Sequence, residues 1–256
     1  MTLPKAYMKV IRNITGYWGT YLPSERLIPG MVGRVENGLF VEDDPLEKYS
    51  GFDRTIHGAA KPEPSRSPVS VWQSKDVVVT STQGKADVTG APVKGSIRLG
   101  FSKANDAVMI CKGIRSQGFK SLGAVRSLLY ELYESGAWDK DLCLITEVVL
   151  VNAAWICFAT NSNQQAEINA SATVGIAEPA LAALKLAAAE GSLTTSWSSD
   201  RSTGYSTEVT EGGTPLFHAI QFKRSLAGLG PTKLQFLRGG SSNFEEPAFG
   251  QDSNAA

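Results

Sequence analysis

The sequence predicts an α+β fold, in which a twisted antiparallel sheet carries peripheral helices. Two observations predict this class. Four segments alternate apolar and polar residues with a period of two, which is typical of antiparallel strands with two different faces. Other segments repeat apolar residues at i, i+3, i+4 and i+7, which is typical of helices that pack on one side.

The first expected element is a short amphipathic helix. Pro4 lies in its first turn and Gly16 ends it. Its apolar side comprises Leu3, Tyr7, Val10, Ile11 and Ile14, and its other side carries Lys5, Lys9 and Arg12. Two short strands are expected next, over 20–27 and 31–40, and Asn37-Gly38 in the second is typical of a tight hairpin turn. An acidic patch follows (Glu42, Asp43, Asp44 and Glu47), and the proline-rich segment 61–68 is expected to be a loop.

The first alternating pair is expected to run from Val77 to Thr89 and back from Val93 to Cys111. In the return segment, apolar residues share one parity and polar residues the other. The apolar set is Val93, Ile97, Leu99 and Phe101, and the polar set is Lys94, Ser96, Arg98 and Ser102.

The middle of the chain contains a second helix and a buried strand region. Ser121 begins the helix, Gly136 ends it, and Val125, Leu128, Leu129 and Leu132 form its apolar stripe. The segment from Leu142 to Ala159 is rich in Leu, Val and Ile, which indicates buried strands.

The second alternating pair is the clearest in the sequence. From Ala166 to Val174 every even position is apolar, including Ile168, Ala170 and Ala172, and every odd position is polar. A return strand fits 193–209, in which Trp197 shares the apolar parity. A third helix, from Pro179 to Glu190, is expected between the two strands.

The last expected strand is Leu216 to Phe222. Residues 1–238 are expected to form one domain, and residues 239–256, which are rich in Gly, Ser and Asn, are expected to be a disordered tail.

The alternation has two interpretations. A bilayer-spanning β-strand needs about 9 to 11 residues with one lipid-facing and one water-facing side, and all four segments are long enough. A sheet in water with one face on a core has the same pattern. The modest apolar side, with Ala, Val and scattered aromatic residues, favours a strand that is stable in water before it enters lipid.

Composition excludes several classes of function. The 256 residues carry no net charge, so no general attraction to nucleic acid is expected. Charge is nevertheless segregated, with a basic stretch over 94–126 and an acidic one over 145–222. The three cysteines (Cys111, Cys143 and Cys157) lie in apolar contexts, which indicates free thiols in a reducing cytosol. No secretory signal and no apolar run long enough for a membrane helix is expected.

The search for catalytic chemistry finds no recognisable motif. His57 and His218 are the only histidines, and neither has Cys or His at metal-ligand spacing. The sequence has no nucleophile elbow and no phosphate-binding glycine loop. Glu147 is interpreted as a hydrogen-bond acceptor in a strand, with a buried acid as the alternative. We therefore expect no enzyme, no cofactor and no metal.

The order of these parts resembles the pore-forming domain of the gasdermins, and among them the compact fungal regulators of cell death. The resemblance is carried by four segments: the basic amphipathic start, Gly19-Thr20-Tyr21-Leu22-Pro23, the helix over 121–135, and Leu144-Ile145-Thr146-Glu147-Val148-Val149. It covers residues 1–224 in order. The chain differs in having only Val35 to Phe40 where gasdermins carry a longer aromatic membrane anchor.

The resemblance implies a membrane pore-former of programmed cell death. Cytoplasmic subunits would bind acidic phospholipids at the inner leaflet of the plasma membrane, self-oligomerise and convert two hairpins into a transmembrane β-barrel. In the fungal members, which act in heterokaryon incompatibility, the trigger would be a variant homologue.

The expected lipid-binding residues are Lys5, Lys9, Arg12, Tyr17 and Trp18. For Tyr17 and Trp18, packing in the protein core is the alternative interpretation. Two other functions remain open: a soluble lipid- or protein-binding module that does not insert, and a hydrolase with an unrecognised site.

Overall fold

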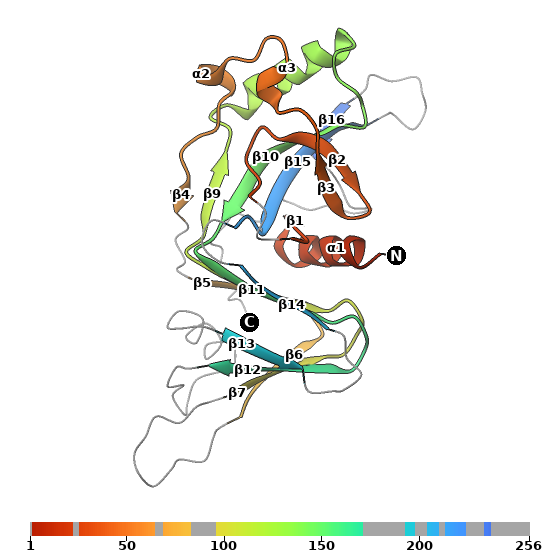
Figure 1. Ribbon diagram of the computed structural model, residues 1–256, viewed down its shortest axis with the longest axis vertical. Coiled ribbons are helices and arrows are strands. Elements are labelled where there is room, and N and C mark those ends of the chain that lie inside the picture. Colours follow the sequence, from red (N-terminus) through yellow and green to blue (C-terminus); the bar gives the residue numbers. More distant parts are fainter. Residues whose placement is uncertain are drawn as a thin grey trace, which may run out of the picture.

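The structure, a computed structural model, is α+β with three antiparallel sheets. It describes residues 2–22, 26–64, 69–82, 96–170, 193–197, 204–209, 213–223 and 233–236. The predicted fold class is confirmed, although the strands divide among several sheets (Figure 1).

The largest sheet, called here the upper sheet, has eight strands. Its main path is β1 (Trp18–Gly19), β15 (Leu216–Lys223), β10 (Cys143–Leu150), β2 (Val32–Glu36) and β3 (Leu39–Glu42). β16 (Lys233–Phe236) pairs with β15, β9 (Arg115–Gly118) with β10, and β4 (Glu63–Pro64) with β9.

Helix α3 (Leu122–Glu134) packs on the upper sheet with its apolar stripe. Val125, Leu128, Leu129 and Leu132 are buried against Leu144 and Ile220. Ser121 caps the helix by accepting a hydrogen bond from the Ala124 N–H at 3.3 Å. The short helix α2 (Arg54–His57) and a turn of 3-10 helix (Leu46–Lys48) lie at the same end of the molecule (Figure 1).

The other two sheets have four strands each and pack face to face. The middle sheet has the order β14 (Tyr205–Val209), β11 (Ala153–Phe158), β8 (Ala107–Lys112) and β5 (Val69–Gln73). The outer sheet has the order β13 (Leu193–Trp197), β12 (Gln164–Ala170), β7 (Ser96–Phe101) and β6 (Val77–Thr82).

Helix α1 (Leu3–Thr15) lies between the upper and middle sheets (Figure 1). Tyr7 and Ile11 pack with the middle sheet, whereas Met8 packs with the upper sheet. Gly16 ends the helix in the left-handed region at a φ of 81°, which glycine adopts without steric cost. The prediction for this helix, including its two-sided pattern, is confirmed.

Most other predicted elements are found. The helix over 121–136, the strand Leu216 to Phe222 and the buried strands between Leu142 and Ala159 are confirmed. Asn37 and Gly38 both have positive φ and close a two-residue hairpin between β2 and β3, as predicted. The three cysteines are free and buried.

Two strand predictions are wrong in part. Residues 20–22, 26 and 27 are not strands, because this segment crosses from β1 to β2 without pairing along a sheet. The return segment 93–111 is not one strand: β7 and β8 belong to different sheets and are separated by a turn with Asn105 at a φ of 69°. The predicted helix over 179–190 and the tail over 239–256 lie outside the described residues.

Candidate functional site

The middle and outer sheets have matching strand orders, and this arrangement is the first candidate feature. β5 continues into β6, β7 into β8, β11 into β12 and β13 into β14, so each strand of one sheet is joined to its counterpart in the other. Counterparts also have the same neighbours. The two sheets are therefore four long strands folded back on themselves.

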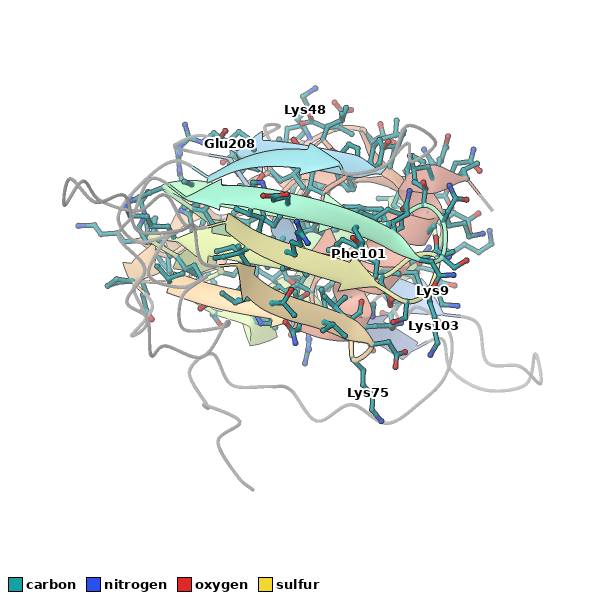
Figure 2. All side chains as sticks on the ribbon, turned by 90° about the horizontal axis from the view of Figure 1, so that it is seen from below. Lys9, Lys48, Lys75, Phe101, Lys103 and Glu208 are labelled. Atoms are coloured by element: carbon teal, nitrogen blue, oxygen red, sulfur yellow. The ribbon has the colours of Figure 1, made fainter. Side chains whose placement is uncertain are left out.

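The outer sheet has one apolar and one polar face, as the period of two predicts. Six of its side chains are buried against the middle sheet: Val77, Ile97, Leu99, Phe101, Ala166 and Ile168. Val78, Thr80, Arg98 and Gln165 occupy the other parity and are exposed. Figure 2 views the molecule from this end.

Four of the residues predicted to face lipid are consequently in a protein core in this state. Ile97, Leu99, Phe101 and Ile168 pack against middle-sheet residues such as Trp155. Ala170 and Trp197 lie on paired strands, opposite Leu193 and Ala166 respectively. Val93 and Ala172 lie outside the described residues.

Polar contacts hold the corners at which the strands turn from one sheet to the other. The Ser74 N–H donates to the Ala107 carbonyl, and the Ala107 N–H donates to Ser74 Oγ, both at 2.9 Å. Lys103 forms an ion pair with Asp76, and the hydrogen bond from Lys103 lowers the pKa of that carboxyl. Each of these groups can exchange its partner for water or for another polar group.

The neighbouring corner is joined by backbone hydrogen bonds. The Asn105 N–H donates to the Ala159 carbonyl at 2.7 Å, and the Ala159 N–H donates to the Asp106 carbonyl at 2.8 Å. The Asp106 carboxylate accepts the Lys103 N–H at 2.9 Å. Apolar packing therefore holds the faces of the two sheets together, while polar bonds shape the corners.

Helix α1 presents part of the predicted basic surface. Lys5 and Lys9 are exposed. Arg12 is half-buried, with its guanidinium carbon 4.4 Å from the centre of the Trp18 ring, which is a cation–π contact. In the view of Figure 2, Lys9 and Lys103 lie toward the same edge of the molecule.

The structure places Tyr17 and Trp18 in the core, which is the alternative that the sequence left open. Tyr17 is 6% exposed and Trp18 is 8% exposed. The Tyr17 hydroxyl donates to Glu147 Oε1 at 3.1 Å, so Glu147 is a hydrogen-bond acceptor on its strand.

His218 stacks on Tyr17 with ring centroids 3.8 Å apart. Burial lowers the pKa of His218 to about 4, with a further contribution from the Arg12 charge. The imidazole is therefore neutral at pH 7 and acts as a packing surface beneath α1.

An exposed apolar surface beside α1 was not predicted. Leu22, Leu39 and Val41 are 48%, 37% and 48% exposed, and with Phe40 and Phe217 they line a groove. The only sequence signal was the apolar run Leu39-Phe40-Val41 directly after the hairpin turn, where alternation alone would place at least one residue in the core.

The tip of the β2–β3 hairpin fixes this groove to the helix. A Cβ built on Gly38 would lie 2.3 Å from the Lys5 nitrogen, so only glycine permits this approach, and its φ of +89° also favours glycine. Thr2 Oγ1 donates to the Asn37 carbonyl at 2.9 Å. Lys5 is thereby held next to the apolar groove.

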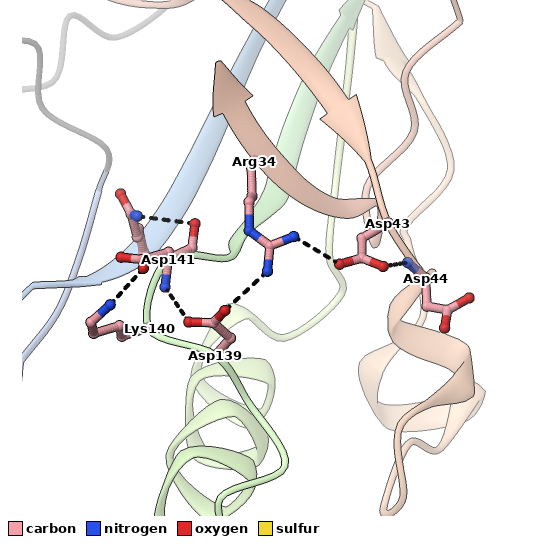
Figure 3. Close-up of polar contacts among 7 residues, drawn as sticks. Arg34, Asp43, Asp44, Asp139, Lys140 and Asp141 are labelled. Carbon is pink, nitrogen blue, oxygen red and sulfur yellow. Dashed lines mark hydrogen bonds and ion pairs between the residues drawn. The ribbon is translucent and has the colours of Figure 1, made fainter.

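The other end of the same hairpin is acidic (Figure 3). Arg34 contacts Asp43 at 3.3 Å and Asp139 at 2.9 Å, which joins the hairpin to the segment after α3. The Asp141 N–H, followed by Arg34, lowers the pKa of Asp139. The hairpin thus has a basic and apolar end at α1 and an acidic end away from it.

Within the described ranges, no group of three or more His, Cys, Asp or Glu side chains is arranged to hold a metal ion. Of the helices in that part of the chain, none is long and apolar enough to cross a membrane.

Comparisons with known proteins show a structural likeness at low sequence identity. No family model matches the sequence, and no curated protein matches it significantly. Among solved structures, a chain in "Cryo-EM structure of the Gasdermin A3 membrane pore" is similar over 94% of this chain and 98% of that chain. The identity is 10% and the TM-score is 0.31. These values are too low to assign a family, so the proposals below rest on the residues of this chain.

Proposed function

We propose that this protein is a non-enzymatic pore-former, which binds anionic phospholipid surfaces, oligomerises and inserts the strands of its outer sheet as a β-barrel. The observation that carries the proposal is the matching order of the middle and outer sheets. Straightening the corners would convert the two folded sheets into one sheet of four long strands without changing any strand's neighbours.

The lengths and faces of these segments suit a bilayer. Residues 77–101 and 164–197 are each long enough for two strands of about 10 residues. The outer sheet already has one continuous apolar face, made of residues such as Leu99 and Ile168, and one polar face. After insertion the apolar face would contact lipid and the polar face would line water.

Opening the sheets in water would be costly. Six apolar side chains of the outer sheet are buried in the shared core. At about 1.5–3 kcal/mol for each large side chain, their exposure would cost on the order of 10 kcal/mol. Lipid would remove this cost, so the membrane itself would drive opening. An open edge in lipid would leave backbone amides unpaired, so several copies must close into a ring.

The surface around α1 supports docking on an anionic membrane. Lys5 and Lys9 are exposed on α1, and Met8 of the same helix lines the groove that contains the exposed Leu39 and Val41. Basic side chains next to exposed apolar ones are typical of interfacial binding, and each basic residue contributes about 1 kcal/mol near an anionic leaflet. The acidic end of the hairpin, at Asp43, would be repelled by anionic headgroups, so the molecule would bind with α1 facing the membrane.

The biological setting is a further part of the proposal. It is supported by the resemblance of sequence segments such as 144–149 to the gasdermin pore-forming domain. The protein would act in programmed cell death at the inner leaflet of the plasma membrane. A variant homologue of a fungal heterokaryon-incompatibility type would be the trigger and would join the oligomer.

Dye release from liposomes tests the proposal. We expect leakage from vesicles that contain acidic phospholipid and none from neutral vesicles. If the protein alone releases no dye, a variant homologue is added to the assay. Binding to acidic vesicles without leakage under either condition would instead support the alternative, a lipid-binding module that does not insert.

A further inference from the structure

We propose that Arg98 and Glu167 form a charge-balanced ring in the pore lumen and determine its ion selectivity. This inference rests on the proposed function and adds to it the property that decides which ions pass.

The two residues lie in one transverse row of the outer sheet. Strand register places Thr80 opposite Arg98, Arg98 opposite Glu167, and Glu167 opposite Ser196. Arg98 Nε lies 3.9 Å from Glu167 Oε2. In this row a guanidinium and a carboxylate lie side by side on the two central strands, with Thr80 of β6 and Ser196 of β13 as their register neighbours.

This row belongs to the polar face. Arg98 and Glu167 alternate with Ile97, Leu99, Ala166 and Ile168, which are at most 1% exposed. Among the polar-face positions of the outer sheet whose side chains the structure describes, Arg98 and Glu167 are the two that carry charge; the others are Val78, Thr80, Gly100 and Gln165. If the apolar face contacts lipid, the charged pair faces water.

Oligomerisation would repeat the pair around the lumen. Residues in one row of a sheet stay close in height after a barrel closes, apart from the stagger of its strands. Each subunit would then add one positive and one negative charge to the same zone. A ring of one sign would select ions of the opposite sign, whereas this ring is balanced and discriminates weakly.

The pair is suited to substitution because it contributes little to the folded state described here. The side chains of Arg98 and Glu167 are 55% and 30% exposed, and exposed ion pairs of this length contribute little to stability. Charge changes at these positions should therefore leave folding intact, which circular dichroism and thermal melting can verify.

The test measures reversal potentials of the pores in planar bilayers under a KCl gradient. We expect Arg98→Glu to shift the reversal potential toward that of K⁺ and Glu167→Arg to shift it toward that of Cl⁻. The double variant R98E/E167R restores the balance and should return to the unsubstituted value. Glu131→Arg, an exposed charge reversal on α3, is the matched control and should cause no shift.

The outcomes separate the two proposals. If no variant and no unsubstituted protein conducts under conditions in which it binds the bilayer, the proposed function fails. If pores conduct but Arg98→Glu and Glu167→Arg leave the reversal potential unchanged, or move it as Glu131→Arg does, the lumen ring is refuted while the pore stands.

Discussion

Two adjacent valines on the edge strand β6 give the sharpest test of strand insertion. Val78 is 57% exposed on the polar face, whereas Val79 packs partly against the core between the sheets. Because successive side chains point to opposite faces, Val78→Arg would place a charge in the lumen and Val79→Arg would place it in lipid. The two variants have identical composition and differ by one position.

The expected magnitudes differ strongly. An Arg on the lipid face of a β-barrel costs about 2–4 kcal/mol near the bilayer midplane, whereas lumen substitutions are tolerated. Every subunit of the ring would bear this cost, so Val79→Arg should reduce leakage by at least about 30-fold, since 1.4 kcal/mol is a factor of ten. In water the long Arg side chain at the edge of the sheet can reach solvent, so both variants should fold.

Three measurements decide the result. Thermal melting establishes that both variants are folded, co-sedimentation with acidic liposomes measures binding, and dye release measures pore formation. We expect equal binding and a selective loss of leakage for Val79→Arg. Equal leakage from both folded variants, or a selective loss for Val78→Arg, would mean that β6 does not enter the membrane with the parity inferred here.

Two further predictions concern α1 and the residues beneath it. The double variant K5E/K9E should no longer co-sediment with acidic liposomes, and its melting temperature should be unchanged because both side chains are exposed. Adding Arg12→Glu should also lower the melting temperature, since it removes the contact with Trp18. Intact liposome binding by the double variant would refute the basic surface. His218 has a pKa of about 4 in the folded state, below its usual 6.5, so the unfolded state binds more protons and stability should fall by at most about 3 kcal/mol as the pH drops from 6.5 to 4. Chemical unfolding of His218→Phe should show a smaller decrease over this window, and an identical pH profile would contradict the assignment.

Much of the local structure was predictable from the sequence. The amphipathic helix over 3–15, the Asn37-Gly38 hairpin and the capped helix after Ser121 follow from local stereochemistry and apolar spacing. The parity of Leu99 and Ile168 was predictable for the same reason, because a period of two fixes which residues share a face.

Other features of the candidate site were not predictable. Tyr17 and Trp18 are residue types typical of membrane-interface anchors, but they are buried because α1 is covered by sheets on two sides. The exposed groove at Leu39 and Val41 arises because Gly38 lets the hairpin tip contact α1. The sequence of the hairpin does not predict which element its tip will contact.

The sequence by itself determined most of the described elements, their order, and which residues of β7 and β12 share a face. Only the tertiary structure decided that the segment from β7 to β8 turns between Ser102 and Asp106, so that its two halves pack on different sheets. The physical reason is that partners from distant segments hold the turn: Ser74 bonds Ala107, and Ala159 bonds Asn105. Periodicity indicates which side of a strand is apolar, whereas the surface that covers that side depends on the rest of the fold.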